Sequence, residues 1–225
     1  MYYQLNFLVA LAVGTQSDSK LMGESNFKII AKTSSKEIEH HSSPGVDLET
    51  LWKKVCSGNE EALGKLFGDM FDSLYSYGYR IIPESEDVRD AIQEVFFQLW
   101  KYRENLSVPD SVRAYLFTSL RHELLNKKKA TSRRSEICNK YLIEEFDALI
   151  NYNSWEEILD LDNHESRELK NAIENLTPRQ REAIYLKYFE GLSTDELSEI
   201  LQMRAQSVYN LVLKAINNLR NYLDK

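Results

Sequence analysis

The chain has 225 residues, of which 43% are hydrophobic and 28% charged, which is enough apolar material for one large core or two small ones. Its formal net charge of −7 argues against a protein that coats nucleic acid indiscriminately, because such binding depends on Lys and Arg neutralising phosphates. With 8 Gly and 4 Pro, the sequence is poor in the turn residues of a β-rich fold, and a mostly helical protein is expected.

The first 46 residues show no sustained hydrophobic period and are predicted to be a disordered extension. The segment Leu5 to Val13 is similar to the apolar part of a signal peptide, but no Lys or Arg precedes it, so we expect a cytoplasmic protein. No apolar run approaches the roughly 18 residues of a membrane helix, and no membrane insertion is expected. Cys56 and Cys138 belong to no disulfide or zinc pattern, so neither a metal nor a cofactor is expected.

Four helices are predicted in the next part of the chain. Asp47 and Asn59 are suited to cap the first two, the second stops before Pro83, and Ser85 begins the third. Apolar side chains recur in each at three- and four-residue spacing, which indicates one buried face. The fourth helix is expected from about Ser111 to Lys128, after a loop over residues 105–110.

The third predicted helix carries side chains of interest on two faces. One face forms an apolar stripe, and Phe96 lies near its edge. The opposite face combines polar and aromatic residues, namely Asp90, Gln93, Glu94, Phe97 and Trp100. Aromatic residues are enriched at the centres of protein interfaces, so this second face predicts a protein-binding surface.

The fourth predicted helix is basic towards its end. Six cations lie between Arg121 and Arg134, against the single acid Glu123. Cations hold phosphates while aromatic rings and loops accept unstacked bases, so this composition favours DNA whose strands are being opened. The alternative is a solvated run of charge at a helix end, where cations also suit the helix dipole.

The chain then changes character. Between Ile137 and Glu168 only two cations accompany nine acids, and residues 131–169 are predicted to be an acidic linker. Thr177 and Pro178 form a helix start, and three helices are expected to follow. The last two, from Leu192 to Ala215, have the pattern of a helix-turn-helix, whose second helix would present outward Arg204, Gln206, Ser207, Tyr209, Asn210 and Lys214.

The order D-x-x-D-x-x-Q-E-x-F-x-x-x-W, from Asp87 to Trp100, resembles region 2.2 of the sigma-70 family of bacterial RNA polymerase sigma factors. In that family this region binds the clamp helices of the polymerase β′ subunit. The resemblance therefore implies that core polymerase is bound by Asp90, Gln93, Glu94, Phe96 and Trp100.

The fourth helix and the loop before it resemble regions 2.3 and 2.4 of the same family, which read the −10 promoter element and capture a flipped base. This implies promoter contacts from Asn105, Ser107, Arg113, Arg121, His122, Asn126, Lys127 and Lys128. The C-terminal unit resembles region 4, which reads the −35 element through the outward residues of the helix-turn-helix. The chain departs from the pattern at His122, where the family usually has Asn, and at Gln202, where it often has Gly. It also departs at Tyr209 and Leu211, where the family often has basic residues.

The resemblance implies an all-α protein of two small helical domains, sigma region 2 over residues 47–130 and sigma region 4 over 170–225. With no further region between them, the chain is similar to extracytoplasmic-function (ECF) sigma factors. The implied partners are core RNA polymerase, through its β′ clamp helices and β flap, promoter DNA and an anti-sigma factor. Such a protein has no small-molecule substrate and catalyses no reaction.

Three other classes stay open on the sequence. One is a helix-turn-helix regulator that does not bind core polymerase, and another is a helical adaptor that does not bind DNA. The third is a magnesium-dependent all-α nucleotide pyrophosphohydrolase, with carboxylates from Glu84 to Glu94 as its metal ligands. That enzyme would need a second helix with facing carboxylates, and no matching repeat is found.

Overall fold

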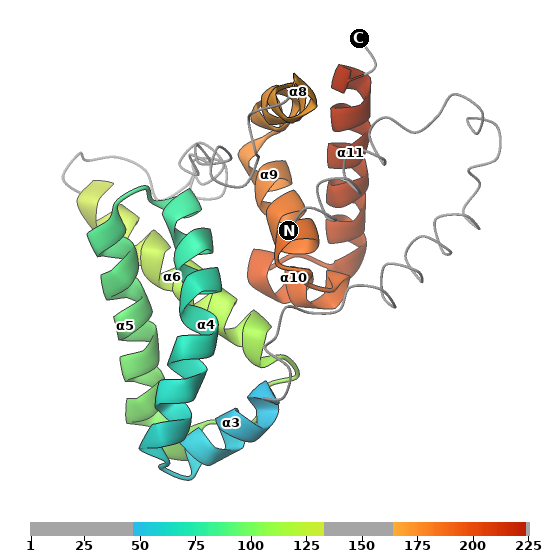
Figure 1. Ribbon diagram of the computed structural model, residues 1–225. Coiled ribbons are helices and arrows are strands. Elements are labelled where there is room, and N and C mark those ends of the chain that lie inside the picture. Colours follow the sequence, from blue (N-terminus) through green and yellow to red (C-terminus); the bar gives the residue numbers. More distant parts are fainter. Residues whose placement is uncertain (1–46, 133–163, 224–225) are drawn as a thin grey trace.

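The computed structural model describes residues 47–132 and 164–223, which form two groups of helices in contact with each other (Figure 1). The first group contains α3 (Leu48–Cys56), α4 (Glu60–Ile81), α5 (Ser85–Tyr102), the short 3-10 helix η1 (Arg103–Asn105) and α6 (Val112–Ser132). The second contains α8 (His164–Glu174), α9 (Pro178–Ile184), the π-helix η2 (Tyr185–Phe189), α10 (Thr194–Leu201) and α11 (Ala205–Leu223). All regular structure in these described residues is helical, which confirms the predicted all-α class. None of these helices is long and apolar enough to span a bilayer.

The predicted N-terminal extension, residues 1–46, lies outside the described residues, as does most of the predicted acidic linker. Helix α8 begins at His164, inside the segment that was predicted to be linker. It packs against α11 and buries Leu169, Ala172 and Ile173. Because most residues of α8 are charged or polar, its short apolar face was not recognised in the sequence.

The helix starts of the first group follow from side-chain caps. The Asp47 carboxylate accepts a hydrogen bond from the backbone N–H of Glu49 at 3.1 Å. The side-chain amide oxygen of Asn59 accepts a hydrogen bond from the backbone N–H of Ala62 at 2.8 Å. Each cap satisfies a backbone donor that the first helical turn leaves without a partner. Both predicted caps are confirmed.

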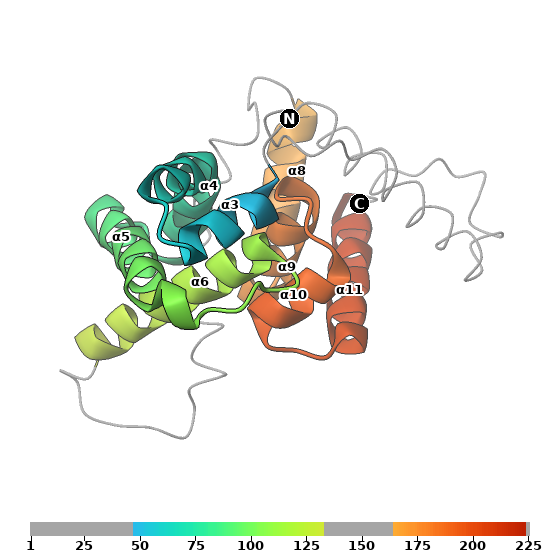
Figure 2. The same cartoon turned by 90° about the horizontal axis from the view of Figure 1, so that it is seen from below.

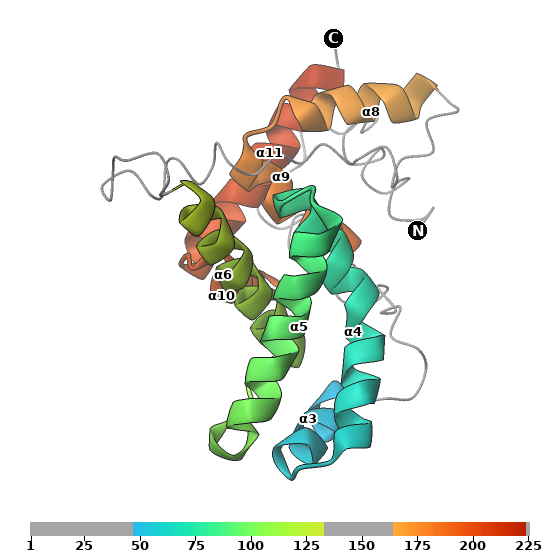
Figure 3. The same ribbon diagram turned by 90° about the vertical axis from the view of Figure 1, so that its left-hand side faces the viewer.

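Helices α4 and α5 run side by side, with α3 across one end of α4 (Figure 3). Their close approach depends on Gly78, where a Cβ atom would lie 2.7 Å from Val88 Cγ1 and 3.3 Å from Leu124 Cδ1. Trp52 of α3 is fully buried and meets the ring of Tyr115 edge-on at 4.9 Å. These contacts fix α6 against the other three helices of the group.

Two capping boxes organise the second group. Thr177 and Gln180 cap α9 reciprocally, and Ser193 and Glu196 do the same for α10. Between α10 and α11 the chain turns at Gln202, whose φ of 53° lies in the left-handed region. Glycine usually occupies such a position because a side chain there is strained.

The two groups also pack against each other, with α6 next to α10 (Figure 2). The buried apolar residues of both groups form one continuous cluster. Nothing in the sequence pattern predicted this contact, which determines how much of α6 is accessible.

Candidate protein-binding and nucleic-acid-binding surfaces

The polar and aromatic side of α5 is largely accessible. Asp90 and Gln93 are exposed, and Phe97 is 56% exposed, the largest value among the exposed large hydrophobic side chains in the described part of the chain. Trp100 is half-buried, with the guanidinium of Arg103 stacked 4.3 Å from its ring centroid. We call this surface, made of Asp90, Gln93, Glu94, Phe97 and Trp100, the docking face.

Phe96 does not belong to the docking face, although the family pattern assigns it to polymerase binding. Its side chain is 5% exposed and packs edge-on against Phe67 at 5.0 Å. A partner on the surface could not reach it without unpacking the domain. The helical projection had placed Phe97 with Gln93 and Trp100, and that signal locates the exposed ring correctly.

The loop between α5 and α6 is held in place by two side chains of α3. The indole N–H of Trp52 donates to the backbone oxygen of Ser107 at 3.1 Å, and the Cys56 thiol lies 3.8 Å from the backbone oxygen of Leu106. Asn105 and Ser107 themselves are exposed. The loop therefore holds two predicted DNA-contacting side chains outward on a backbone fixed to α3.

The predicted promoter-contacting residues of α6 do not share one surface. Arg121 is buried at 6% exposure, and its guanidinium faces Glu182 of α9. Arg113 faces Glu190, and the ring of His122 contacts the amide of Gln202. These three side chains are turned toward the second helix group, which the sequence did not indicate.

Two of the remaining members of that set, Lys127 and Lys128, lie near the start of α5. Lys127 Nζ is 3.7 Å from the carboxylate of Asp87 and 3.5 Å from that of Asp90. Burial lowers the pKa of Lys128, while the nearby carboxylate of Glu84 acts in the opposite direction. Asn126 is exposed. Lys127 thus links the docking face to the basic end of α6.

The helix-turn-helix formed by α10 and α11 presents its predicted reading residues to solvent. All six are exposed: Arg204, Gln206, Ser207, Tyr209, Asn210 and Lys214. The opposite side of α11 is buried through Val208, Val212 and Ala215. A helix with one buried side and one polar, cationic side has the form that enters a DNA major groove.

A metal centre finds no support in residues 47–132 and 164–223. No group of three or more His, Cys, Asp or Glu side chains in this part of the chain could hold a metal ion. The acids of α5 that were considered as magnesium ligands include Asp87 and Asp90, and Lys127 lies beside both of them.

Comparisons with known proteins show which families and relatives the chain is similar to. The family model for sigma-70 region 2 matches residues 66–134, and that for sigma-70 region 4 matches residues 166–219. The ECF RNA polymerase sigma factor SigK of Mycobacterium ulcerans is 22% identical over 179 residues, covering 79% of this chain and 94% of the relative. SigK of Mycobacterium sp. (strain JLS) is 24% identical over 178 residues, covering 79% and 91%.

Solved structures share the fold. CnrH, in complex with the cytosolic domain of CnrY, has a TM-score of 0.52 at 20% identity and covers 79% of this chain and 98% of its own. The sigma factor RpoE from Bartonella quintana, in complex with the anti-sigma factor NepR, has a TM-score of 0.50 at 18% identity and covers 72% and 96%. With both sigma-70 regions matched in their family order, the chain belongs to the sigma-70 family and is an RNA polymerase sigma factor of the extracytoplasmic-function type.

Proposed function

We propose that residues 47–130 bind core RNA polymerase through the docking face of α5 and contact the −10 element through α6 and its preceding loop. Residues 170–225 would read the −35 element through α11, and the β flap is the expected polymerase contact of this second unit. The protein catalyses no reaction of its own, because the chemistry of RNA synthesis belongs to the polymerase.

The observation that carries this proposal is the exposure of Phe97 beside Gln93 and Trp100. A soluble domain gains by burying such a ring, so an aromatic residue left at 56% exposure among polar residues fits a partner-binding surface. Phe97 lies within residues 66–134, which match sigma-70 region 2.

An anti-sigma factor is the further partner that we propose. It is supported by RpoE, which shares this fold and whose structure was solved with the anti-sigma factor NepR. Such a partner would act in the cytoplasm by competing with polymerase or DNA for the same helices.

The test combines binding with transcription. Purified protein is mixed with core RNA polymerase, and co-migration is followed by gel filtration. Run-off transcription on a genomic fragment library then maps where transcripts begin with and without the protein. We expect co-migration and a new set of start sites. A protein that neither co-migrates with core polymerase nor changes start sites would refute the proposed function.

DNA binding distinguishes the sigma factor from the helix-turn-helix regulator and from the helical adaptor. We expect weak binding of the protein alone to duplex promoter DNA, because the net charge is −7, and strong binding once core polymerase is present. Equal binding with and without polymerase would instead indicate an ordinary helix-turn-helix regulator. No binding under either condition would indicate an adaptor.

A further inference from the structure

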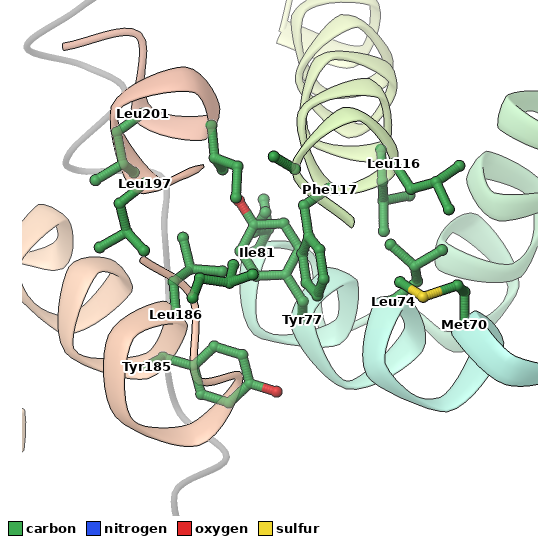
Figure 4. Packing of buried hydrophobic residues seen from close by; sticks show 14 of the residues in the cluster. Met70, Leu74, Tyr77, Ile81, Leu116, Phe117, Tyr185, Leu186, Leu197 and Leu201 are labelled. Atoms are coloured by element: carbon green, nitrogen blue, oxygen red, sulfur yellow. The ribbon is translucent and has the colours of Figure 1, made fainter. Parts of the chain in front are cut away.

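Trp100 lies at the edge of the first helix group. The middle of that group is filled by apolar side chains of α4 and α6 such as Met70, Leu74 and Leu116 (Figure 4). Trp100 is only half-buried against this core, near the C-terminal end of α5. The core therefore does not enclose its ring, and contacts at the surface are needed to hold the ring in one orientation for a partner.

The side chain of Arg103 supplies such contacts. Its guanidinium carbon lies 4.3 Å from the centroid of the Trp100 ring, within the range of a cation–π interaction. Its Nη1 donates to the backbone oxygen of Trp100 at 2.7 Å, and its Nη2 lies 3.5 Å from the exposed carboxylate of Glu104. One side chain thus contacts both the ring and the backbone of Trp100.

Helical geometry explains why Arg103 reaches this ring. Arg103 is the third residue after Trp100 and the C-cap of α5, and its φ of −48° and ψ of −37° continue the helical conformation. Residues three apart are neighbours on a helix surface, and helical side chains lean toward the N-terminal end. The side chain of Arg103 therefore lies over the preceding turn, where the Trp100 ring is.

Arg103 also begins a series of backbone hydrogen bonds that leads into the loop before α6. Its N–H donates to the backbone oxygen of Trp100, and its own oxygen accepts from the N–H of Leu106 at 3.3 Å. The far end of this series is held by the two side chains of α3 that contact the loop, at Leu106 and Ser107. The docking face and the loop are therefore joined by two successive turns of backbone.

The space around Arg103 is limited on the side of α3. Its side chain is 26% exposed, and its Nε lies 3.8 Å from the place that a Cβ atom would occupy at Gly58. Gly58 lies in the turn between α3 and α4 and has a φ of 84°, a conformation that favours glycine. Arg103 is therefore enclosed between the Trp100 ring and this turn, which restricts the movement of its guanidinium.

We propose that Arg103 is a positioning residue that couples the docking face to the loop before α6. It holds the ring of Trp100 in the orientation that polymerase meets. Through the backbone between residues 100 and 106 it also holds Asn105 and Ser107, which are expected to contact the −10 element. The proposal rests on the proposed function, because it requires Trp100 to contact polymerase and the loop to contact DNA.

Arg103 acts in this proposal through its neighbours and not by touching polymerase or DNA. Its Nη1 is engaged with the backbone of Trp100, and its Nη2 with Glu104. Truncation of Arg103 should therefore weaken polymerase binding only while the Trp100 ring is present. A residue that contacted polymerase itself would have an independent effect, and a double-mutant cycle distinguishes the two cases.

The first test is that cycle, measured as the Kd for core polymerase by fluorescence anisotropy of the labelled protein. Arg103→Ala should weaken binding about fivefold, as expected for the loss of one cation–π contact. In the Trp100→Ala background the same change should alter the Kd by less than about twofold, because the ring that it positions is gone. Full additivity of the two changes would overturn the proposal by showing an independent contact.

Lys65→Ala is the matched control for the loss of charge. Lys65 is an exposed cation of α4, paired with Glu61 of the same helix. Its replacement removes one positive charge, as Arg103→Ala does, without touching Trp100 or the loop. We expect its Kd for core polymerase to equal that of the unchanged protein, and an equal loss in both variants would attribute the effect to net charge and overturn the proposal.

The second test observes the two ends of the coupling in the free protein. The chain has three tryptophans, of which Trp100 reports on the docking face and Trp52, which donates to the backbone oxygen of Ser107, reports on the loop. The protein is labelled with 5-fluorotryptophan, and the two 19F resonances are assigned with Trp52→Phe and Trp100→Phe. We expect both resonances to shift or broaden in Arg103→Ala and neither to change in the Lys65→Ala control.

The third test measures the loop during initiation. Transcription is started from a promoter found by the run-off experiment, at protein concentrations that saturate core polymerase. Arg103→Ala should still lower transcription from duplex DNA, and should lower it less from a template that is already melted at the −10 element. Equal transcription by the two proteins on duplex DNA would refute the coupling to the loop.

Arg103→Lys guards against a simple loss of the fold. Lysine retains the charge but lacks the planar group that stacks on a ring and donates in a fixed geometry. Its Kd for core polymerase should lie between those of the unchanged protein and Arg103→Ala. Thermal unfolding followed by circular dichroism checks that the helices persist in each variant.

The outcomes separate this proposal from the proposed function. The positioning role is refuted if the unchanged protein binds core polymerase and Arg103→Ala binds it as tightly, or if the Trp100 resonance is the same in both. Core binding and start-site selection would stand in that case. Absence of core binding by the unchanged protein would instead remove the proposed function, while the 19F spectra would still show whether Arg103 holds the ring and the loop.

Discussion

Replacement of Phe97 by Ala tests the docking face most directly. The side chain is 56% exposed, so of the roughly 200 Å² that a phenylalanine can bury, about 110 Å² is available to a partner. At about 25 cal/mol per Å² this area corresponds to about 2.8 kcal/mol, or roughly a hundredfold in Kd. We expect Phe97→Ala to weaken core-polymerase binding by ~30- to 100-fold, measured by fluorescence anisotropy with a labelled protein.

The fold should be unaffected by this change. About 90 Å² of the ring is already buried within the domain, so by the same relation its removal should lower the free energy of unfolding by no more than about 2 kcal/mol and leave the helices folded. Tyr102→Ala is the matched control, because Tyr102 is 48% exposed on the same helix but points about 140° away around its axis. A Kd for Phe97→Ala within twofold of that for Tyr102→Ala would refute the docking face.

Phe96→Ala tests whether Phe96 is a core residue, as in the structure, or a polymerase-binding residue, as the family pattern implies. Phe96 is 5% exposed against Phe67, so its truncation should cost about 3 kcal/mol of stability by leaving a cavity. Denaturant unfolding measures that loss. If Phe96→Ala weakened polymerase binding while stability stayed unchanged, the exposed ring would not be the one that docks.

Other predictions follow from single contacts. Trp52→Phe removes the hydrogen bond to the backbone oxygen of Ser107, so the free energy of unfolding measured in urea should fall by about 1 kcal/mol. Transcription from duplex promoter DNA should decrease, and transcription from pre-melted templates should decrease less. Gly78→Ala places a methyl group 2.7 Å from a side chain of α5 and should destabilise by about 1–3 kcal/mol, whereas Gly64→Ala meets nothing within 4 Å and should stabilise by about 0.5–1 kcal/mol. Arg204→Ala should weaken holoenzyme binding to DNA that carries the −35 element and reduce the salt dependence by about one phosphate contact, with no change in core binding.

The order of the helices could be predicted from the sequence because its signals are local. Asp47, Asn59 and Ser193 each cap a helix within three residues of themselves, and a 3.6-residue period sets the buried side of α5 without reference to the rest of the chain. The same period placed Phe97 on the exposed side. The family motif instead assigned Phe96 to the exposed side, because a sequence motif does not record which of two neighbouring residues is buried.

The contact between the helix groups was decided only by tertiary structure. Arg121 was expected to contact DNA, yet its guanidinium is buried against Glu182, which lies far along the chain. No local period or cap relates these two residues, because their pairing depends on which sides of α6 and α9 come together. The sequence determined which helices form and which face of each is apolar, with the exception of α8. How those faces meet, and therefore which cations remain available to DNA, follows from burying both apolar faces in one core.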